Sequence, residues 1–178
     1  GLGDVYKRQA KKLSEYRRKA AERFVAEVTG ELEFLNIPKV KLVVDQKNGK
    51  LTVNGMDTIE FLISANVGEE PKPIAKIASG GELSRIMLAL KNVIADKDSI
   101  ETLIFDEIDT GVSGRAAQKI GLKLNQISKI RQVLCVTHLS QIAVMADNHL
   151  LIEKGVCGER TVTTVKRLDF EQRKYEIA

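Results

Sequence analysis

Three short stretches of the sequence place chemically versatile residues at the ends of apolar runs. TLIFDE ends in Asp106 and Glu107, the following loop IDTGVSG adds Asp109, and VLCVTH ends in His138. An adjacent acid pair suits phosphate chemistry, because one carboxylate can hold Mg²⁺, usually through water, while the next polarises an attacking water. A histidine beside them can hydrogen-bond a terminal phosphate or that water. Each residue alone also has a structural interpretation, as a loop cap or a strand-end residue.

A fourth stretch, IASGGELSRIML, places Gly80 and Gly81 directly in front of an amphipathic helix. Ser79 and Glu82 have the spacing of a capping box, which needs neither glycine. Glycine costs about 1 kcal/mol relative to alanine in a helix. The first N–H groups of a helix have no internal partners and carry the positive end of its dipole, so bare glycines allow an anion to approach them. The stretch therefore predicts a phosphate contact, whereas a plain capped helix explains Ser79 and Glu82 alone.

The acid pair and the histidine stand in a strand–helix–strand order. TLIFDE and VLCVTH are continuous apolar runs, typical of strands buried on both faces of a parallel sheet. Between them, residues 114–127 predict a helix with its N-cap at Ser113. Ligands of doubly wound sheets bind at the carboxyl ends of the strands. The pattern predicts an α/β fold with a mostly parallel sheet flanked by helices.

The first part of the chain predicts different elements. Residues 10–36 show a narrow apolar stripe with charged flanks, as in a helix of a coiled coil, and Pro38 ends it. KVKLVVD and KLTVNG, separated by the turn signal QKNG, predict a small β-hairpin, and residues 57–66 a third strand. Residues 1–9 match no element, which leaves open whether they are native. We therefore divide the chain into 1–9, 10–36 as the end of a coiled-coil helix, and 37–178 as an α/β lobe.

Composition limits the kinds of protein that the sequence can encode. The chain has 178 residues, 43% of them hydrophobic, so it can bury one sizeable core. Its net charge is +4. No apolar run approaches the roughly 20 residues that a membrane helix needs. Two cysteines without metal-site or disulfide spacing favour the cytoplasm. Residues 7–23 contain eight basic side chains against two acidic ones, and a solvated helix face or a nucleic-acid contact would each explain them.

Taken together, these stretches resemble the C-terminal lobe of an ABC-type ATPase head. The runs PIAKIASGGELSRIMLALK, FDEIDTGVSG and VTHLSQIAVMAD are similar to the RecN family, a bacterial DNA-repair branch of the SMC-like ATPases. The resemblance implies that SGGE is the signature motif and LIFDE the Walker B strand with Glu107 as the catalytic glutamate. It also implies that Asp109 is the D-loop aspartate and His138 the switch histidine. The implied fold is the C-terminal head lobe, preceded by a coiled-coil helix and a small hairpin region.

The resemblance implies ATP and Mg²⁺ as cofactors. Ser79, Gly80 and Gly81 would contact the γ-phosphate of ATP held by the opposite subunit, and Glu82 belongs to the same cofactor-binding motif. Asp106 would help place Mg²⁺, and Asp109 would couple the two nucleotide sites. Implied partners are DNA, the N-terminal half of the same head with its Walker A lobe, and a second head in an ATP-dependent homodimer at the nucleoid, with no membrane. No GxxxxGK[ST] motif occurs in the sequence, so we expect this chain to be inactive by itself.

Two other functions share some of these features. A transporter nucleotide-binding subunit has the same motifs but couples to membrane helices. The basic, coiled-coil-like helix and Glu82 favour the SMC-like branch instead. The other alternative is a non-catalytic DNA- or partner-binding module in which the acids and His138 are structural. That module would form no ATP-dependent dimer when the missing half is supplied.

Overall fold

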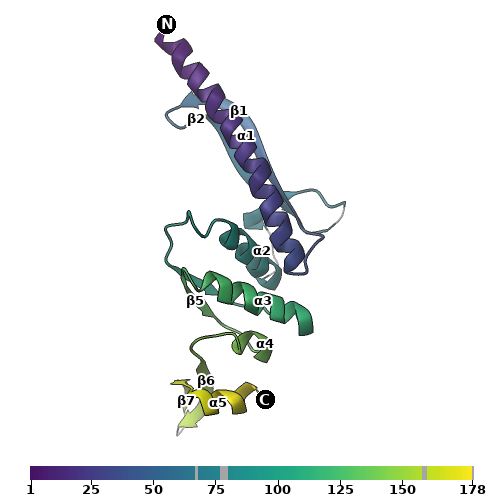
Figure 1. Ribbon diagram of the computed structural model, residues 1–178, viewed down its shortest axis with the longest axis vertical. Helices are drawn as coiled ribbons and strands as arrows, with labels where there is room; N and C mark the ends of the chain where they lie inside the picture. Colours follow the sequence, from purple (N-terminus) through teal and green to yellow (C-terminus); the bar gives the residue numbers. More distant parts are fainter. Residues whose placement is uncertain (67, 77–79, 158–159, 178) are drawn as a thin grey trace. The chain divides into compact units, whose positions relative to one another are not determined.

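The computed structural model describes residues 1–66, 68–76, 80–157 and 160–177 (Figure 1). The chain divides into two compact units, Gly1–Ser99 and Ile100–Ala178. We call these unit 1 and unit 2, and each has its own sheet and helices. None of the described helices combines the length and apolarity that crossing a membrane requires.

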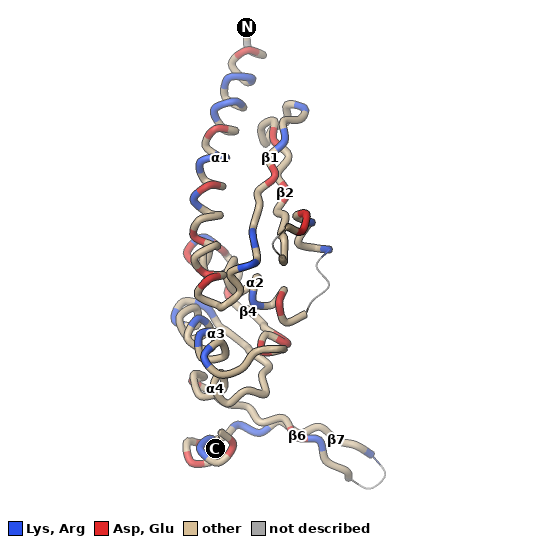
Figure 2. Tube along the Cα trace, turned by 90° about the vertical axis from the view of Figure 1, so that its right-hand side faces the viewer, with Lys and Arg blue, Asp and Glu red and all other residues tan. Residues whose placement is uncertain are grey.

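Unit 1 consists of a long helix, an antiparallel sheet and a second helix. The β1–β2 hairpin runs along α1 (Figures 1 and 2). The short strand β3 pairs with the end of β2. Its elements are α1 (Leu2–Phe34), β1 (Lys41–Thr52), β2 (Gly55–Ser64), β3 (Lys72–Pro73), the 3₁₀ turn η1 (Ile74–Lys76) and α2 (Gly80–Val93).

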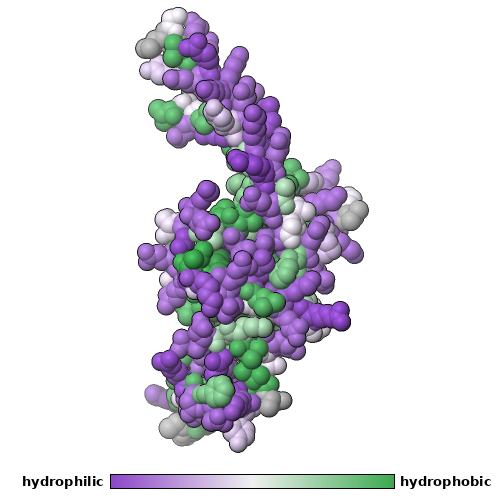
Figure 3. Space-filling model, viewed as in Figure 1, coloured by the Kyte–Doolittle hydropathy of each residue, from purple (hydrophilic) through white to green (hydrophobic). Residues whose placement is uncertain are grey.

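The core of unit 1 forms around the C-terminal half of α1. Val28, Leu32 and Leu35 are at most 1% exposed, which confirms that the apolar stripe of this helix faces a packing partner. Each such side chain contributes about 2 kcal/mol through burial. Farther towards the N-terminus, the stripe residues Leu13 and Tyr16 are 37% and 59% exposed. The face of α1 seen in Figure 3 is largely hydrophilic.

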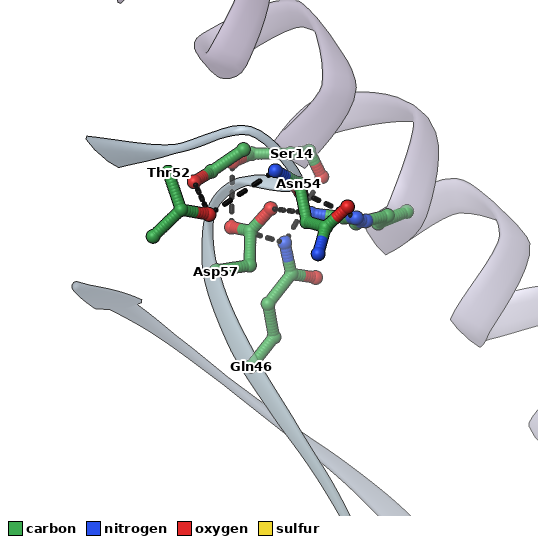
Figure 4. Close-up of polar contacts among 7 residues, drawn as sticks. Ser14, Gln46, Thr52, Asn54 and Asp57 are labelled. Carbon is green, nitrogen blue, oxygen red and sulfur yellow. Dashed lines mark hydrogen bonds and ion pairs between the residues drawn. The ribbon is translucent and has the colours of Figure 1, made fainter. Parts of the chain in front are cut away.

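A buried carboxylate fastens the N-terminal half of α1 to the hairpin (Figure 4). Asp57 on β2 has a side chain with 0% exposure. Its Oδ1 accepts hydrogen bonds from Ser14 Oγ at 2.5 Å and Gln46 Nε2 at 3.0 Å, and its Oδ2 accepts one from Arg17 Nη1 at 2.9 Å. The hydrogen bonds from Ser14 and Gln46, with that from Arg17, lower the pKa of Asp57 to about 2. We call these four residues the Asp57 cluster.

Two expectations about unit 1 are wrong. The helix begins at Leu2, so it includes residues expected to fit no element. The hairpin turn follows Thr52 rather than lying at residues 46–49, because β1 continues through the first Asn-Gly pair and a register shift between Asn48 and Thr52 absorbs the irregularity. The second Asn-Gly pair supplies the turn, with Gly55 at a φ of 96°. The expected third strand is therefore β2, the return strand of the same hairpin.

Unit 2 is built on a parallel strand pair joined by a helix. β4 pairs with β5 in parallel from Thr102↔Gln132 to Phe105↔Cys135, and α3 connects them, as expected. Ser113 is the N-cap of α3, although its side chain makes no cap hydrogen bond. The elements are β4 (Thr102–Phe105), α3 (Gly114–Ile127), β5 (Gln132–Cys135), α4 (Ser140–Ala143), the antiparallel pair β6 (Leu150–Cys157) and β7 (Arg160–Arg167), and α5 (Phe170–Ile177).

The expectation that β4 and β5 are buried on both faces is wrong for this chain. Burial alternates along β4, where Leu103 and Phe105 are buried while Ile104 is 70% exposed. On β5 and just after it, Leu134 and Val136 are 45% and 53% exposed. The reason is that no other described element covers these three side chains. We call Ile104, Leu134 and Val136 the open apolar face.

Candidate functional site

Asp106, Glu107 and His138 lie in the loops that follow β4 and β5, at one edge of the parallel strand pair. Phe105 and Cys135 are register partners at the ends of β4 and β5, and the N–H of Val136 donates to the carbonyl of Phe105 at 2.9 Å. Asp106 follows β4 directly, and His138 lies three residues beyond β5. The two loops that carry these residues therefore start side by side, at the carboxyl edge that the sequence pattern indicated.

Glu107 has a left-handed backbone, with a φ of 56°. Its N–H donates to Asp106 Oδ1 at 2.8 Å, and its carbonyl accepts from the N–H of Thr110 at 3.1 Å, so a tight turn follows at once. This conformation costs a residue with a side chain about 1–2 kcal/mol. Both acids are exposed. A strained backbone that presents an exposed carboxylate is the kind of feature that clusters at functional sites.

Asp109 turns inward rather than outward. Its side chain is 3% exposed, and its Oδ2 accepts hydrogen bonds from Thr137 Oγ1 at 2.6 Å and from the N–H of His138 at 2.9 Å. The same Oδ2 lies 3.1 Å from Nδ1 of the His138 ring. Burial alone would raise the pKa of Asp109, but the hydrogen bonds from Thr137 and His138 outweigh it and the pKa lies below its ordinary value. Asp109 is therefore an ionised carboxylate at neutral pH.

The His138 side chain is 75% exposed although its backbone is held firmly. The N–H of Leu139 donates to Thr137 Oγ1 at 3.1 Å, and α4 begins immediately afterwards at Ser140. The ring of His138 thus has Nδ1 against Asp109 and most of its surface open to solvent. No sequence signal predicts this contact beyond the fact that both residues follow apolar runs, since they are 29 positions apart.

The signature stretch belongs to unit 1. α2 begins at Gly80, which is exposed, while Gly81 is buried and Glu82 lies half-buried in the first turn. Ile86 and Leu88 are 0% exposed and hold the helix in the core of its unit. Ser79 lies outside the described residues, so the capping box remains a prediction.

Cys135, at the end of β5, is a poor nucleophile. Burial, with smaller contributions from the charges of Asp109 and Asp106, raises the pKa of this thiol to about 11. This fits the expected small buried hydrophobic residue, although its side chain is partly exposed.

The carboxylates at this strand edge suit Mg²⁺ bound together with a nucleotide better than a metal ion bound by protein ligands alone. Among the residues that the structure describes, no three His, Cys, Asp or Glu side chains are grouped closely enough to hold a metal ion themselves. Asp106 and Glu107 each offer an exposed carboxylate. Magnesium in phosphate-transfer sites takes one or two carboxylates together with waters and phosphate oxygens. One or two exposed carboxylates therefore fit Mg²⁺ held with a nucleotide and do not fit a metal site built from protein ligands alone.

Comparison with known proteins identifies relatives of the whole stretch. No protein-family model matches the chain. The chain is 44% identical over 171 residues to DNA repair protein RecN of Halalkalibacterium halodurans, covering 93% of this chain and 30% of that protein. It is 42% identical over 185 residues to RecN of Bacillus subtilis, covering 95% and 32%. The chain is a relative of the RecN proteins. It spans about a third of their length, and the matching stretch is their C-terminal part.

Solved structures similar to this RecN relative are SMC heads. The Smc head domain of Pyrococcus yayanosii with a coiled coil and joint has a TM-score of 0.62 at 20% identity, covering 91% of this chain and 29% of that one. The Smc head domain of Pyrococcus furiosus with an extended coiled coil has a TM-score of 0.59 at 19% identity, covering 93% and 39%. These similarities confirm the expected fold, the C-terminal lobe of an SMC-type head. A transporter subunit is not favoured, since the relatives are DNA-repair proteins.

Proposed function

We propose that this chain is the C-terminal part of an SMC-like ATPase head that acts in DNA double-strand break repair and recombination, in the cytoplasm at the nucleoid. It would supply the signature motif, the Walker B acids and the switch histidine for ATP binding and hydrolysis where two heads meet. The observation that carries the proposal is the common strand edge of Asp106, Glu107 and His138 in a chain related to RecN over nearly its whole length.

The placement of the edge residues supports a role for each of them. Bound ATP with Mg²⁺ would supply the phosphoryl group and the counter-charge for its transfer to water. Asp106, exposed at the end of β4, would help hold the Mg²⁺, through a water. Glu107, presented by the strained turn, would orient and polarise the attacking water. His138, with its ring largely open to solvent, would hydrogen-bond the terminal phosphate.

The signature residues would act across the dimer. The first N–H groups of α2 have no partners within the helix, and Gly80 is exposed, so an anion can approach the helix start. Ser79, Gly80 and Gly81 would thus bind the γ-phosphate of ATP held on the opposite subunit, and Glu82 completes the same motif. Closure of the heads would then depend on the nucleotide.

A second lobe of the head would complete unit 2. Parallel sheets in proteins are covered on both faces, whereas Ile104 of the open apolar face is 70% exposed. We propose that the Walker A lobe of the same polypeptide covers this face and supplies the phosphate-binding loop. The chain by itself should therefore not hydrolyse ATP. DNA would be a further partner, with the exposed basic residues of α1 as one candidate contact.

Reconstitution tests this function directly. The Walker A lobe is co-expressed with this chain, and ATP turnover is measured with and without DNA. We expect turnover only when both parts are present. Glu107→Gln should reduce turnover strongly while ATP-driven head association persists. Turnover at the normal rate in that variant would contradict the role of Glu107.

A second pair of variants tests the contact across the dimer. Ser79→Arg should block ATP-dependent association, because the long side chain would occupy the place of the phosphate. Ser99→Arg, a matched change at an exposed position outside the signature motif, should leave association unchanged. Equal association in both variants would rule out the phosphate contact in trans. No ATP-dependent dimer even for the unsubstituted protein would favour the non-catalytic module.

A further inference from the structure

The buried carboxylate of Asp109 faces the ring of His138 across the two strand-end loops. Asp109 Oδ2 and His138 Nδ1 are 3.1 Å apart, with the carboxylate 3% exposed and the imidazole 75% exposed. An ionised carboxylate offers only lone pairs. A nitrogen this close is favourable only when it carries the proton, because two lone pairs at that distance repel each other. In a neutral imidazole, a proton on Nδ1 leaves Nε2 as the acceptor.

The same oxygen also fixes the backbone that carries the ring. Oδ2 of Asp109 accepts from the N–H of His138 at 2.9 Å and from Thr137 Oγ1 at 2.6 Å. Thr137 Oγ1 in turn accepts from the N–H of Leu139 at 3.1 Å. One group on the loop after β4 therefore sets both the main chain and the ring nitrogen at the end of β5. The main chain that carries the ring is therefore fixed by the same oxygen that lies 3.1 Å from Nδ1.

We propose that Asp109 is a positioning residue for His138, which keeps the proton on Nδ1 and turns Nε2 towards the space outside the strand edge. This inference rests on the proposed function, which brings a phosphate or a water to that space. It assigns Asp109 a role within its own subunit. A carboxylate that is 3% exposed presents almost no surface to a second subunit, which separates this role from coupling between two sites.

The protonated nitrogen can be observed without any enzymatic turnover. The full-length protein that contains this chain is labelled with ¹⁵N-histidine, and His138 is assigned by the signal lost in His138→Gln. We expect the Nδ1–H form in the unsubstituted protein and a shift towards Nε2–H in Asp109→Ala. Thr137→Val, which removes a neighbouring hydrogen bond to Asp109 but keeps the ring contact, should retain Nδ1–H. An Nε2–H ring in the unsubstituted protein would overturn the proposal.

Kinetics separate positioning from a general structural role. Asp109→Asn keeps the size of the side chain, so it also serves if the alanine variant does not fold. We expect it to lower kcat for ATP hydrolysis about tenfold or more while KM for ATP changes little, as for other groups that orient a functional histidine. In the His138→Gln background the same change should add no further loss, because Asp109 acts through the ring. An equal loss in both backgrounds would overturn the proposal.

The tautomer of the His138 ring and the turnover of ATP test different claims. If the unsubstituted full-length protein does not turn over ATP, the proposed function is wrong, and the ring tautomer still decides whether Asp109 positions His138. If turnover is normal but the ring carries its proton on Nε2, only the positioning role is wrong.

Discussion

The backbone N–H of Glu107 donates a 2.8 Å hydrogen bond to Oδ1 of Asp106, so the first acid holds the start of the turn that presents the second. Glu107 has a φ of 56° in this arrangement. The residue is exposed to solvent. The unfavourable backbone therefore belongs to an exposed turn and not to the packed core.

Replacing Glu107 by glycine should leave stability almost unchanged. Relief of the left-handed conformation stabilises by about 1 kcal/mol, and the extra freedom of glycine in the unfolded chain offsets about 0.5–1 kcal/mol of it. Glu101→Gly, at an exposed position without a positive φ, should lower the free energy of unfolding by about 0.5–1 kcal/mol. Urea unfolding of both variants measures the difference. Equal losses would mean that the turn at Glu107 stores no strain.

The Asp57 cluster should make stability depend on acid. The pKa of Asp57 is about 2 in the folded protein against an ordinary value of 3.8, so the unfolded chain binds its proton first as the pH falls. The stabilisation is complete above about pH 4 and is lost as the pH falls through about 2. Asp57→Asn should therefore have a lower Tm than the unsubstituted chain at pH 7, with the gap closing between about pH 4 and 2.

A control variant separates the Asp57 cluster from general acid effects. Asp96→Asn changes an exposed aspartate just after α2 and should shift Tm little at either pH. A gap between Asp57→Asn and the unsubstituted chain that stays constant from pH 7 to pH 2 would mean that the charge of Asp57 does not stabilise the fold.

Two helical glycines should respond oppositely to alanine. At Gly30 in α1, an added Cβ would meet nothing within 4 Å, so Gly30→Ala should stabilise by up to about 1 kcal/mol. At Gly121 in α3, the Cβ would lie 3.0 Å from Met145 Cγ and 3.2 Å from the carbonyl oxygen of Gln141. The loss from moving α4 should exceed the gain in helix propensity, so Gly121→Ala should destabilise. Thermal unfolding of the two variants checks the sign, and stabilisation by both would contradict the close packing of α3 and α4.

Elements whose start and period are encoded within a few neighbouring residues can be predicted from the sequence. The stretch from Gly114 to Ile127 forms the expected helix with Ser113 at its N-cap, since an N-cap signal and an apolar period lie within the same few residues. Local signals do not place the hairpin turn, because two Asn-Gly pairs six residues apart carry the same signal and pairing across the whole hairpin decides between them.

Contacts between distant residues could not be predicted in this way. The shared edge of Asp106 and His138 followed from the topology of parallel strands, which the sequence pattern indicates. The inward turn of Asp109 depends on a hydroxyl and an N–H that are 28 and 29 positions away, and no spacing rule connects them. The alternating burial of β4 depends on what covers the strand, and an apolar run alone does not specify that.

The thiol of Cys135 should react slowly. A pKa of about 11 leaves roughly 100-fold less thiolate at pH 8 than an ordinary thiol with a pKa near 9. In a Cys157→Ser background, alkylation by iodoacetamide should be slower by about that factor than in the urea-unfolded chain. Asp106→Asn should speed the reaction in the folded chain, since it removes one of the two negative charges that raise the pKa. A rate equal to that of the unfolded chain would contradict the raised pKa.

The Asp57 cluster also has a mechanical consequence for α1. It grips the helix at Ser14 and Arg17, and Ser14 is about 30 Å along the helix axis from its last residue, Phe34, at 1.5 Å per residue. The β1–β2 hairpin therefore supports the helix against bending over that length. A sideways force on the N-terminal end of α1 would bend the helix near Ser14. The sheet that contains the hairpin would resist bending of the part between Ser14 and Phe34.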